Sequence, residues 1–164
     1  MSLSAAAYPA RAPQRLSRAG ELLLDATLRS DFLFWLAWRA ARPAMIRAIL
    51  GTRPSVMGLA SAEERARAGG VADHILPVSA RRLGLLNDGV VIGSLAPYAL
   101  ERIAAPTLVL GLRDDLYGTW DGARYTAEHV RGARFVGYPT GGHLFVGRGR
   151  QVFAEVVAFL RDNP

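Results

Sequence analysis

The chain has 164 residues, 51% of them hydrophobic, with no Cys and a formal net charge of +6, and all 20 of its basic residues are Arg. This length suffices for one domain with a sizeable core, and the lack of Cys excludes a disulfide scaffold, thiol catalysis and thiolate metal sites. The apolar run at residues 32–38 is far shorter than the roughly 20 residues of a membrane-spanning helix. The first seven residues also lack the features of a secretory signal, so we predict no membrane association and a cytoplasmic location.

The first part of the chain is predicted to be one short strand followed by helices. Residues 1–8 have the composition of a short buried strand, and Pro9 and Pro13 then interrupt regular structure. Over residues 16–100 apolar residues recur at helical spacing, which predicts amphipathic helices with broad apolar faces. The residues that show this spacing most clearly are Leu22, Leu23, Ala26, Phe32, Leu33, Leu36 and Ala40.

Prolines and a capping pattern divide this helical stretch. Pro43 is predicted to end or kink one helix. Ser61 and Glu64 have the spacing of a capping box, in which each side chain bonds a free backbone N–H, so a helix is predicted to start there. Pro77 ends that run, and residues 79–86 are predicted to form a short helical piece that stops at the Asn-Asp-Gly sequence after it.

The last third of the chain is predicted to alternate between strand and helix. Residues 107–110 form a continuous apolar run, as expected for a strand buried on both faces of a parallel sheet. Residues 119–130 are predicted to be a helix, residues 134–138 a second strand and residues 151–160 a closing helix. This order predicts an α/β fold with a right-handed crossover and a short parallel sheet. Such a sheet leaves an open edge unless further strands cover it.

Polar clusters follow both strands at the end where open α/β sheets bind ligands. The cluster at 111–115 contains Asp114 and Asp115, and the cluster at 139–143 ends in His143 after two glycines. An Asp that accepts a hydrogen bond from an imidazole N–H fixes its tautomer and stabilises the imidazolium, as a catalytic triad requires. The glycine pair permits a sharp turn that aims the ring back at the sheet. Read singly, these residues are more typical of turns and of structural histidines, whereas their joint placement indicates a site.

At this point the sequence resembles the α/β-hydrolase family. Residues 103–114 (IAAPTLVLGLRD) look like the penultimate strand of that family, which ends at the triad acid, and residues 133–143 (ARFVGYPTGGH) look like its last strand and catalytic His. The acid-then-His order also agrees with the family order Ser, Asp, His. The resemblance covers residues 103–160 and implies a partial α/β-hydrolase fold in which the last two or three strands form the sheet. It implies Asp114 and His143 as the catalytic residues.

The resemblance also divides the chain into parts. Residues 1–15 would be the end of a core strand and a loop, residues 16–100 a helical cap or lid, and residues 101–164 the C-terminal part of the hydrolase core. Within the cap, residues 77–84 resemble a segment of esterase-like and C–C-hydrolase-like members.

The chain departs from the family at the nucleophile. It contains no Gly-x-Ser-x-Gly, and Ser94 has one neighbouring Gly in the wrong place and is predicted to be a loop or cap residue. The oxyanion loop of the family is missing too. Because removing triad members from a serine hydrolase costs on the order of a million-fold in rate, we expect a truncated hydrolase with little activity alone. Its nucleophile would come from outside these residues.

The leading hypothesis is therefore a serine hydrolase of ester, lactone or related carbonyl substrates, with a small-molecule substrate and no cofactor. The alternative is a non-catalytic remnant that pairs through its open sheet edge with itself or with a partner chain. Nucleic-acid binding is a third reading of the basic charge; the Arg residues are scattered and often beside acids, so we predict none.

Two further groups of residues have a structural and a functional reading. His74, His129 and His143 show no metal-ligand spacing, so no metal is predicted. Four aromatic residues of the helical stretch indicate core packing, or in a cap the lining of an apolar pocket. These are Phe32, Phe34, Trp35 and Trp38.

Overall fold

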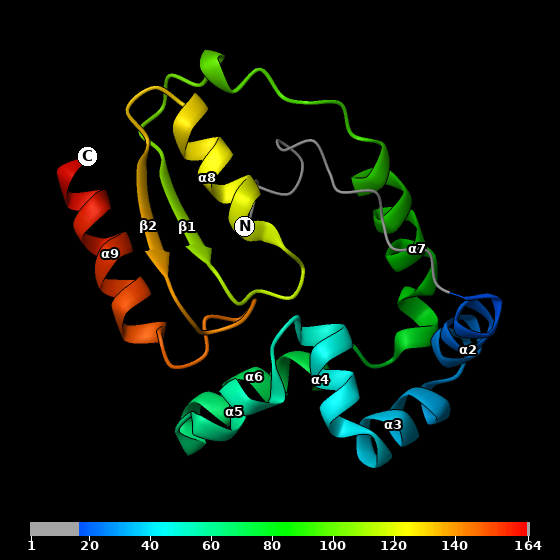
Figure 1. Ribbon diagram of the computed structural model, residues 1–164. Coiled ribbons are helices and arrows are strands. Elements are labelled where there is room, and N and C mark those ends of the chain that lie inside the picture. Colours follow the sequence, from blue (N-terminus) through cyan, green and yellow to red (C-terminus); the bar gives the residue numbers. More distant parts are fainter. Residues whose placement is uncertain (1–16, 164) are drawn as a thin grey trace.

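The computed structural model describes residues 17–163, which are mostly helical and contain one two-stranded parallel sheet (Figure 1). The mixed α/β class and the parallel sheet agree with the prediction, whereas the strand expected over residues 1–8 lies outside the described residues. In chain order the elements are α2 (Arg18–Arg29), α3 (Asp31–Ala40), α4 (Arg42–Leu50), α5 (Pro54–Leu59), α6 (Ala62–Asp73), α7 (Val78–Ser94), the 3-10 helix η1 (Leu100–Arg102), β1 (Leu108–Leu112), α8 (Thr119–His129), β2 (Arg134–Tyr138) and α9 (Gly149–Asp162). No helix within residues 17–163 combines the length and the apolar character needed to cross a membrane.

The sheet is built around a pair of glycines. Gly111 of β1 lies opposite Gly137 of β2 in the parallel register. A Cβ atom at Gly137 would lie 2.6 Å from the ring of Trp120, so the glycines leave the space that this indole of α8 occupies. Trp120 also meets Phe135 edge to face at 5.4 Å between ring centroids. The glycine pair therefore lets the crossover helix α8 pack close against both strands.

Helices α4, α5 and α6 pack against the loop that follows β2. Their buried side chains include Ile46, Leu50, Met57 and Ala68, and these form one cluster with Val146 of that loop. Burial of such apolar side chains is the main force that holds two segments together. The α4–α6 helices thus pack against the C-terminal α/β part through the loop that follows β2.

Helices α2, α3 and α7 form a second group, and polar contacts help to join them. Arg82 of α7 lies 2.6 Å from Asp25 of α2, and Asp31 of α3 accepts hydrogen bonds of 2.9 Å from both the backbone N–H and the hydroxyl of Ser79. Many large apolar side chains of these helices are exposed. They include Leu22, Leu23, Phe32, Leu83, Val90 and Ile92.

One expectation for the helices needs correction. A helix does end just before Pro43, as predicted: α3 stops at Ala40, and Pro43 lies in the first turn of α4, where a missing N–H costs nothing. The helix predicted over residues 79–86 does not stop at Asn-Asp-Gly, because α7 continues through it to Ser94. Asn, Asp and Gly cost only about 1 kcal/mol or less each inside a helix, so these residues do not by themselves end it. The predicted helix start and the serine half of the capping box are confirmed, since Glu64 N–H donates to Ser61 Oγ at 3.2 Å, while the Glu64 carboxylate accepts hydrogen bonds from Arg67.

Candidate active site

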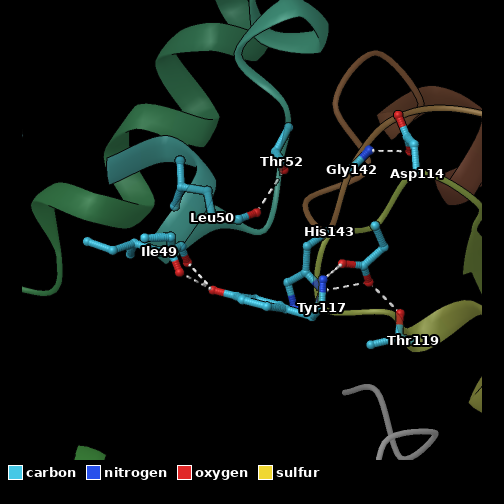
Figure 2. Close-up of polar contacts among 10 residues, drawn as sticks. Ile49, Leu50, Thr52, Asp114, Tyr117, Thr119, Gly142 and His143 are labelled. Carbon is cyan, nitrogen blue, oxygen red and sulfur yellow. Dashed lines mark hydrogen bonds and ion pairs between the residues drawn. The ribbon is translucent and has the colours of Figure 1, made fainter. Parts of the chain in front are cut away.

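Two loops meet at the carboxyl ends of β1 and β2. The backbone N–H of Arg113, just after β1, donates to the carbonyl of Tyr138 at 3.1 Å and extends the ladder of the sheet by one step. The loop beyond β1 carries both aspartates, and the loop beyond β2 carries His143 (Figure 2). The expected meeting of an acid and a histidine at this edge is therefore present.

The acid in contact with the imidazole is Asp115. Its Oδ2 lies 3.0 Å from His143 Nδ1, and the exposed fraction of the Asp115 side chain is 2%, against 34% for His143. The hydroxyl of Thr119 donates to the same oxygen, and the backbone N–H of Tyr117 donates to Oδ1 at 2.8 Å. The carboxylate is thus buried behind a half-exposed ring and held by three donors.

These donors keep Asp115 ionised. Burial by itself raises the pKa of Asp115, but the hydrogen bonds from His143, Thr119 and the Tyr117 N–H outweigh it and hold the pKa below its usual value. An ionised carboxylate can accept hydrogen bonds but cannot donate one. A neutral His143 therefore carries its proton on Nδ1, facing Asp115, and has a lone pair on Nε2. Within residues 17–163 we find no hydrogen-bond partner for Nε2. That atom is therefore available to take a proton from an incoming hydroxyl.

Asp114 does not have the contact expected of it. Its carboxylate accepts hydrogen bonds from the hydroxyl of Thr140 at 2.7 Å, from the N–H of Gly142 at 2.9 Å and from the N–H of Gly141 at 3.3 Å. The expectation that Asp114 orients His143 is thus wrong in geometry, because adjacent loop residues point their side chains in different directions. Asp114 instead closes the turn that presents the histidine.

The two glycines before His143 are required by backbone angles and by crowding. Gly141 has φ +149° and Gly142 has φ +60°, a region that other residues rarely adopt. A Cβ atom would lie 2.5 Å from Leu112 Cδ2 at the first position and 2.4 Å from Thr52 Oγ1 at the second. The turn therefore brings the histidine loop into direct contact with the chain just after α4.

The sequence reasoning missed several residues of the site, among them Thr119, Gly51 and Tyr117. The carbonyl of Gly51 accepts the backbone N–H groups of Leu116 at 3.0 Å and of His143 at 3.3 Å. The Tyr117 ring meets the imidazole edge to face at 4.7 Å between centroids. A glycine after an apolar helix is a recognisable C-cap signal, and Gly51 has that place after α4. The sequence holds no comparable signal for Tyr117.

Hydroxyl groups of the described residues do not supply a nucleophile. Thr119 donates to Asp115, Thr52 donates to the carbonyl of Leu50, and Ser94 donates to the carbonyl of Val91 in its own helix. Over residues 17–163 no Ser or Thr hydroxyl is hydrogen-bonded to His143. Nor does this part of the chain contain a cluster of three residues suited to hold a metal ion.

The four aromatic residues of the helical stretch are divided between burial and exposure. Phe34 is buried, and Trp38 packs against the α4–α6 cluster, which agrees with core packing. Phe32 and Trp35 are exposed. A cavity of about 240 Å³ lies beside Phe34, Trp35 and Trp38, and it is not lined by His143.

His143 Nδ1 and Asp115 Oδ2 lie at hydrogen-bond distance, so this carboxylate can fix the tautomer of the imidazole. A cavity of about 930 Å³ lies beside β1 and is not lined by Asp115 or His143. Comparisons of the chain with protein-family models, with curated proteins and with solved structures find no match.

Proposed function

We propose that the chain carries the acid–base part of a serine hydrolase of the α/β-hydrolase type, acting on an ester, a lactone or a related carbonyl compound. The observation that carries this proposal is the 3.0 Å contact between His143 Nδ1 and the buried carboxylate of Asp115. Its position at the carboxyl ends of two parallel strands supports the same reading, because open α/β sheets bind ligands there.

In this mechanism His143 Nε2 accepts the proton of a hydroxyl nucleophile as that oxygen attacks the substrate carbonyl. Asp115 holds the ring in the correct tautomer and stabilises the imidazolium, which then gives the proton to the leaving group. The nucleophile comes from outside the described residues, and the chemistry needs no cofactor. The cytoplasmic location predicted from the sequence stays part of the proposal.

Complementation tests this function. The chain is co-expressed with an α/β-hydrolase fragment that carries the nucleophile elbow, and hydrolysis of a p-nitrophenyl ester is measured. We expect activity in the complex that falls by at least about a thousand-fold in His143→Ala. An unchanged rate in that variant would show that His143 is not the base.

A second candidate function, binding of an extended strand, is favoured by the groove of about 930 Å³ along β1. Leu108, Val109 and Leu110 of β1 line it together with Val130, just after α8, and Phe159 of α9. In the described residues β1 pairs only with β2, so its other edge has free N–H and C=O groups. Strand addition at such an edge is a known binding mode.

A strand without its own helix fits this groove better than a second copy of the chain. Helix α8 contacts β1 more than β2 (Figure 1). Pairing β1 with its copy would bring two such helices to about the 4.8 Å spacing of strands, whereas packed helices need about 8–10 Å. Light scattering after size exclusion separates the cases: a clean monomer counts against self-pairing, and a dimer that Leu110→Pro converts to monomer would support it, because the N–H of Leu110 faces away from β2.

A further inference from the structure

The C-terminal end of helix α4 contacts both loops of the Asp115–His143 pair. Figure 2 shows Tyr117 lying between the end of this helix, at Ile49, and the ring of His143. These contacts come from a part of the chain more than 60 residues before the pair. The helix is therefore joined directly to the groups that we propose to act in proton transfer.

Gly51 is the backbone part of this junction. One carbonyl oxygen accepts an N–H from the acid-bearing loop and an N–H from the histidine loop, through Leu116 and His143. Gly51 has φ +52°, and a Cβ atom there would lie 2.9 Å from His143 Cβ and 2.9 Å from Tyr117 Cδ2. Only glycine lets the end of α4 approach the imidazole and the phenol ring together.

Tyr117 is the side-chain part. Its hydroxyl lies 2.7 Å from the carbonyl oxygen of Ile49 and 3.0 Å from that of Ala48, and shares one hydrogen between them. Both carbonyls belong to the last turn of α4, where they have no partner in the helix. With its hydroxyl held there, the ring is fixed edge-on against His143. Its backbone N–H meanwhile donates to Asp115.

We propose that Gly51 and Tyr117 are positioning residues that make the orientation of the His143 imidazole depend on the position of helix α4 against the two loops. Displacement of α4 removes the hydroxyl anchor of Tyr117 and the shared acceptor at Gly51, so the ring of His143 is released from one side while Asp115 remains. The effect of these two residues on catalysis rests on the proposed function. Their effect on the orientation of the His143 imidazole can be tested on the chain alone.

The test uses the full chain labelled with ¹⁵N in its histidines and measured by NMR at pH 8, where an ordinary imidazole is neutral. His143→Gln identifies the signals of His143 among those of the three histidines. The observables are the ¹⁵N shifts of the ring, which report the tautomer, and the exchange rate of the Nδ1 proton with water. Asp115→Asn is the reference variant for loss of the pair.

Tyr117→Phe removes the hydroxyl anchor and keeps the ring. We expect the Nδ1 proton of His143 to exchange about fivefold to tenfold faster, the effect of about one net hydrogen bond. The matched control is Tyr138→Phe, because within the described residues the buried Tyr138 hydroxyl has no hydrogen-bond partner. That control should leave both observables unchanged.

Gly51→Ala adds a methyl group between the two rings and should shift the ¹⁵N signals of His143. Its matched control is Gly132→Ala, which has a similar backbone angle, φ +73°, but meets no described atom within 4 Å. The control therefore carries the same backbone strain without the contact. If Gly51→Ala does not fold, as judged by circular dichroism, Tyr117→Phe decides the matter.

The outcomes separate the two proposals. If Asp115→Asn alters the His143 signals and Tyr117→Phe behaves like Tyr138→Phe, the positioning role is overturned and the proposed function stands. If Asp115→Asn changes nothing, the pair does not form in solution and the proposed function fails with it. In the complemented enzyme the positioning role predicts a fall in kcat for Tyr117→Phe at unchanged KM.

Discussion

The α4–α6 helices and the α2, α3 and α7 helices come from one continuous helical stretch, yet they relate to the rest of the molecule in opposite ways. The α4–α6 group buries apolar side chains against Val146 of the histidine loop. The α2, α3 and α7 group is linked by polar pairs, and it buries Phe34 and Val78 but leaves many of its large apolar side chains in contact with water. One group is thus part of the candidate site, and the other is not.

The difference shows where a mutation should reach the site. Apolar burial gives a large, short-range stabilisation that a close-packed cluster transmits to its neighbours. Exposed ion pairs contribute little and are screened by salt. We therefore expect changes near α4 to alter both folding and His143, and changes at exposed positions of the α2, α3 and α7 group to alter neither strongly.

The largest expected effect is on catalysis by the complemented enzyme. Asp115→Asn should lower kcat by about a thousand- to ten-thousand-fold, since an amide does not hold the imidazole in the required tautomer. Asp114→Asn should lower it much less, because Asp114 contacts the turn at Thr140 and Gly142 but not the ring. Asp31→Asn, in the α2, α3 and α7 group, should leave kcat unchanged. Equal losses at both loop aspartates would contradict the assignment.

The next effect is on stability. Leu50 is almost fully buried in the α4–α6 cluster, so Leu50→Ala should lower the free energy of unfolding by roughly 2 to 5 kcal/mol. Leu83 of α7 is exposed, and Leu83→Ala should stay within about 0.5 kcal/mol of the original protein. Urea denaturation followed by circular dichroism measures both. A large loss for Leu83→Ala would mean that the second helix group is buried in solution.

Acid sensitivity gives a third comparison. Because the pKa of Asp115 is lower in the folded than in the unfolded chain, its contribution to stability is complete above the unfolded pKa, near 4, and is lost as the pH falls through the folded value. Asp115→Asn should therefore flatten the decline in the free energy of unfolding below about pH 4. Urea denaturation at a series of pH values tests this. An equally steep decline in the variant would contradict it.

The smallest effect concerns salt. Asp25 of α2 has its pKa lowered by hydrogen bonds from Arg82 and Arg29, but its carboxylate is exposed, so dissolved ions screen these pairs. Asp25→Asn should therefore change the acid limb of stability only at low ionic strength, whereas the effect of Asp115→Asn should persist at about 1 M salt. Repeating the pH series with and without salt measures this. The opposite ranking would place Asp115 near the surface.

Sequence patterns located the elements of the site but not its contacts. The second strand was predicted over the residues that form β2, and the glycine pair before His143 was recognised as a turn. The choice between Asp114 and Asp115 was wrong by one residue, because periodicity places a loop at the end of a strand without orienting each side chain in it. The course of α7 through Asn-Asp-Gly was missed because these residues disfavour a helix by only about 1 kcal/mol or less each and do not by themselves end one.

The sequence by itself determined the strand–helix–strand order, the parallel sheet and the presence of an acid and a histidine at one edge, because these depend on local periodicity and chain connectivity. Only the tertiary structure decided that Asp115 faces the imidazole, that Asp114 closes the turn, and that Gly51 and Tyr117 connect helix α4 to the pair. These contacts join residues distant in the chain. Burial and hydrogen bonding select them only once the loops and helices have packed together.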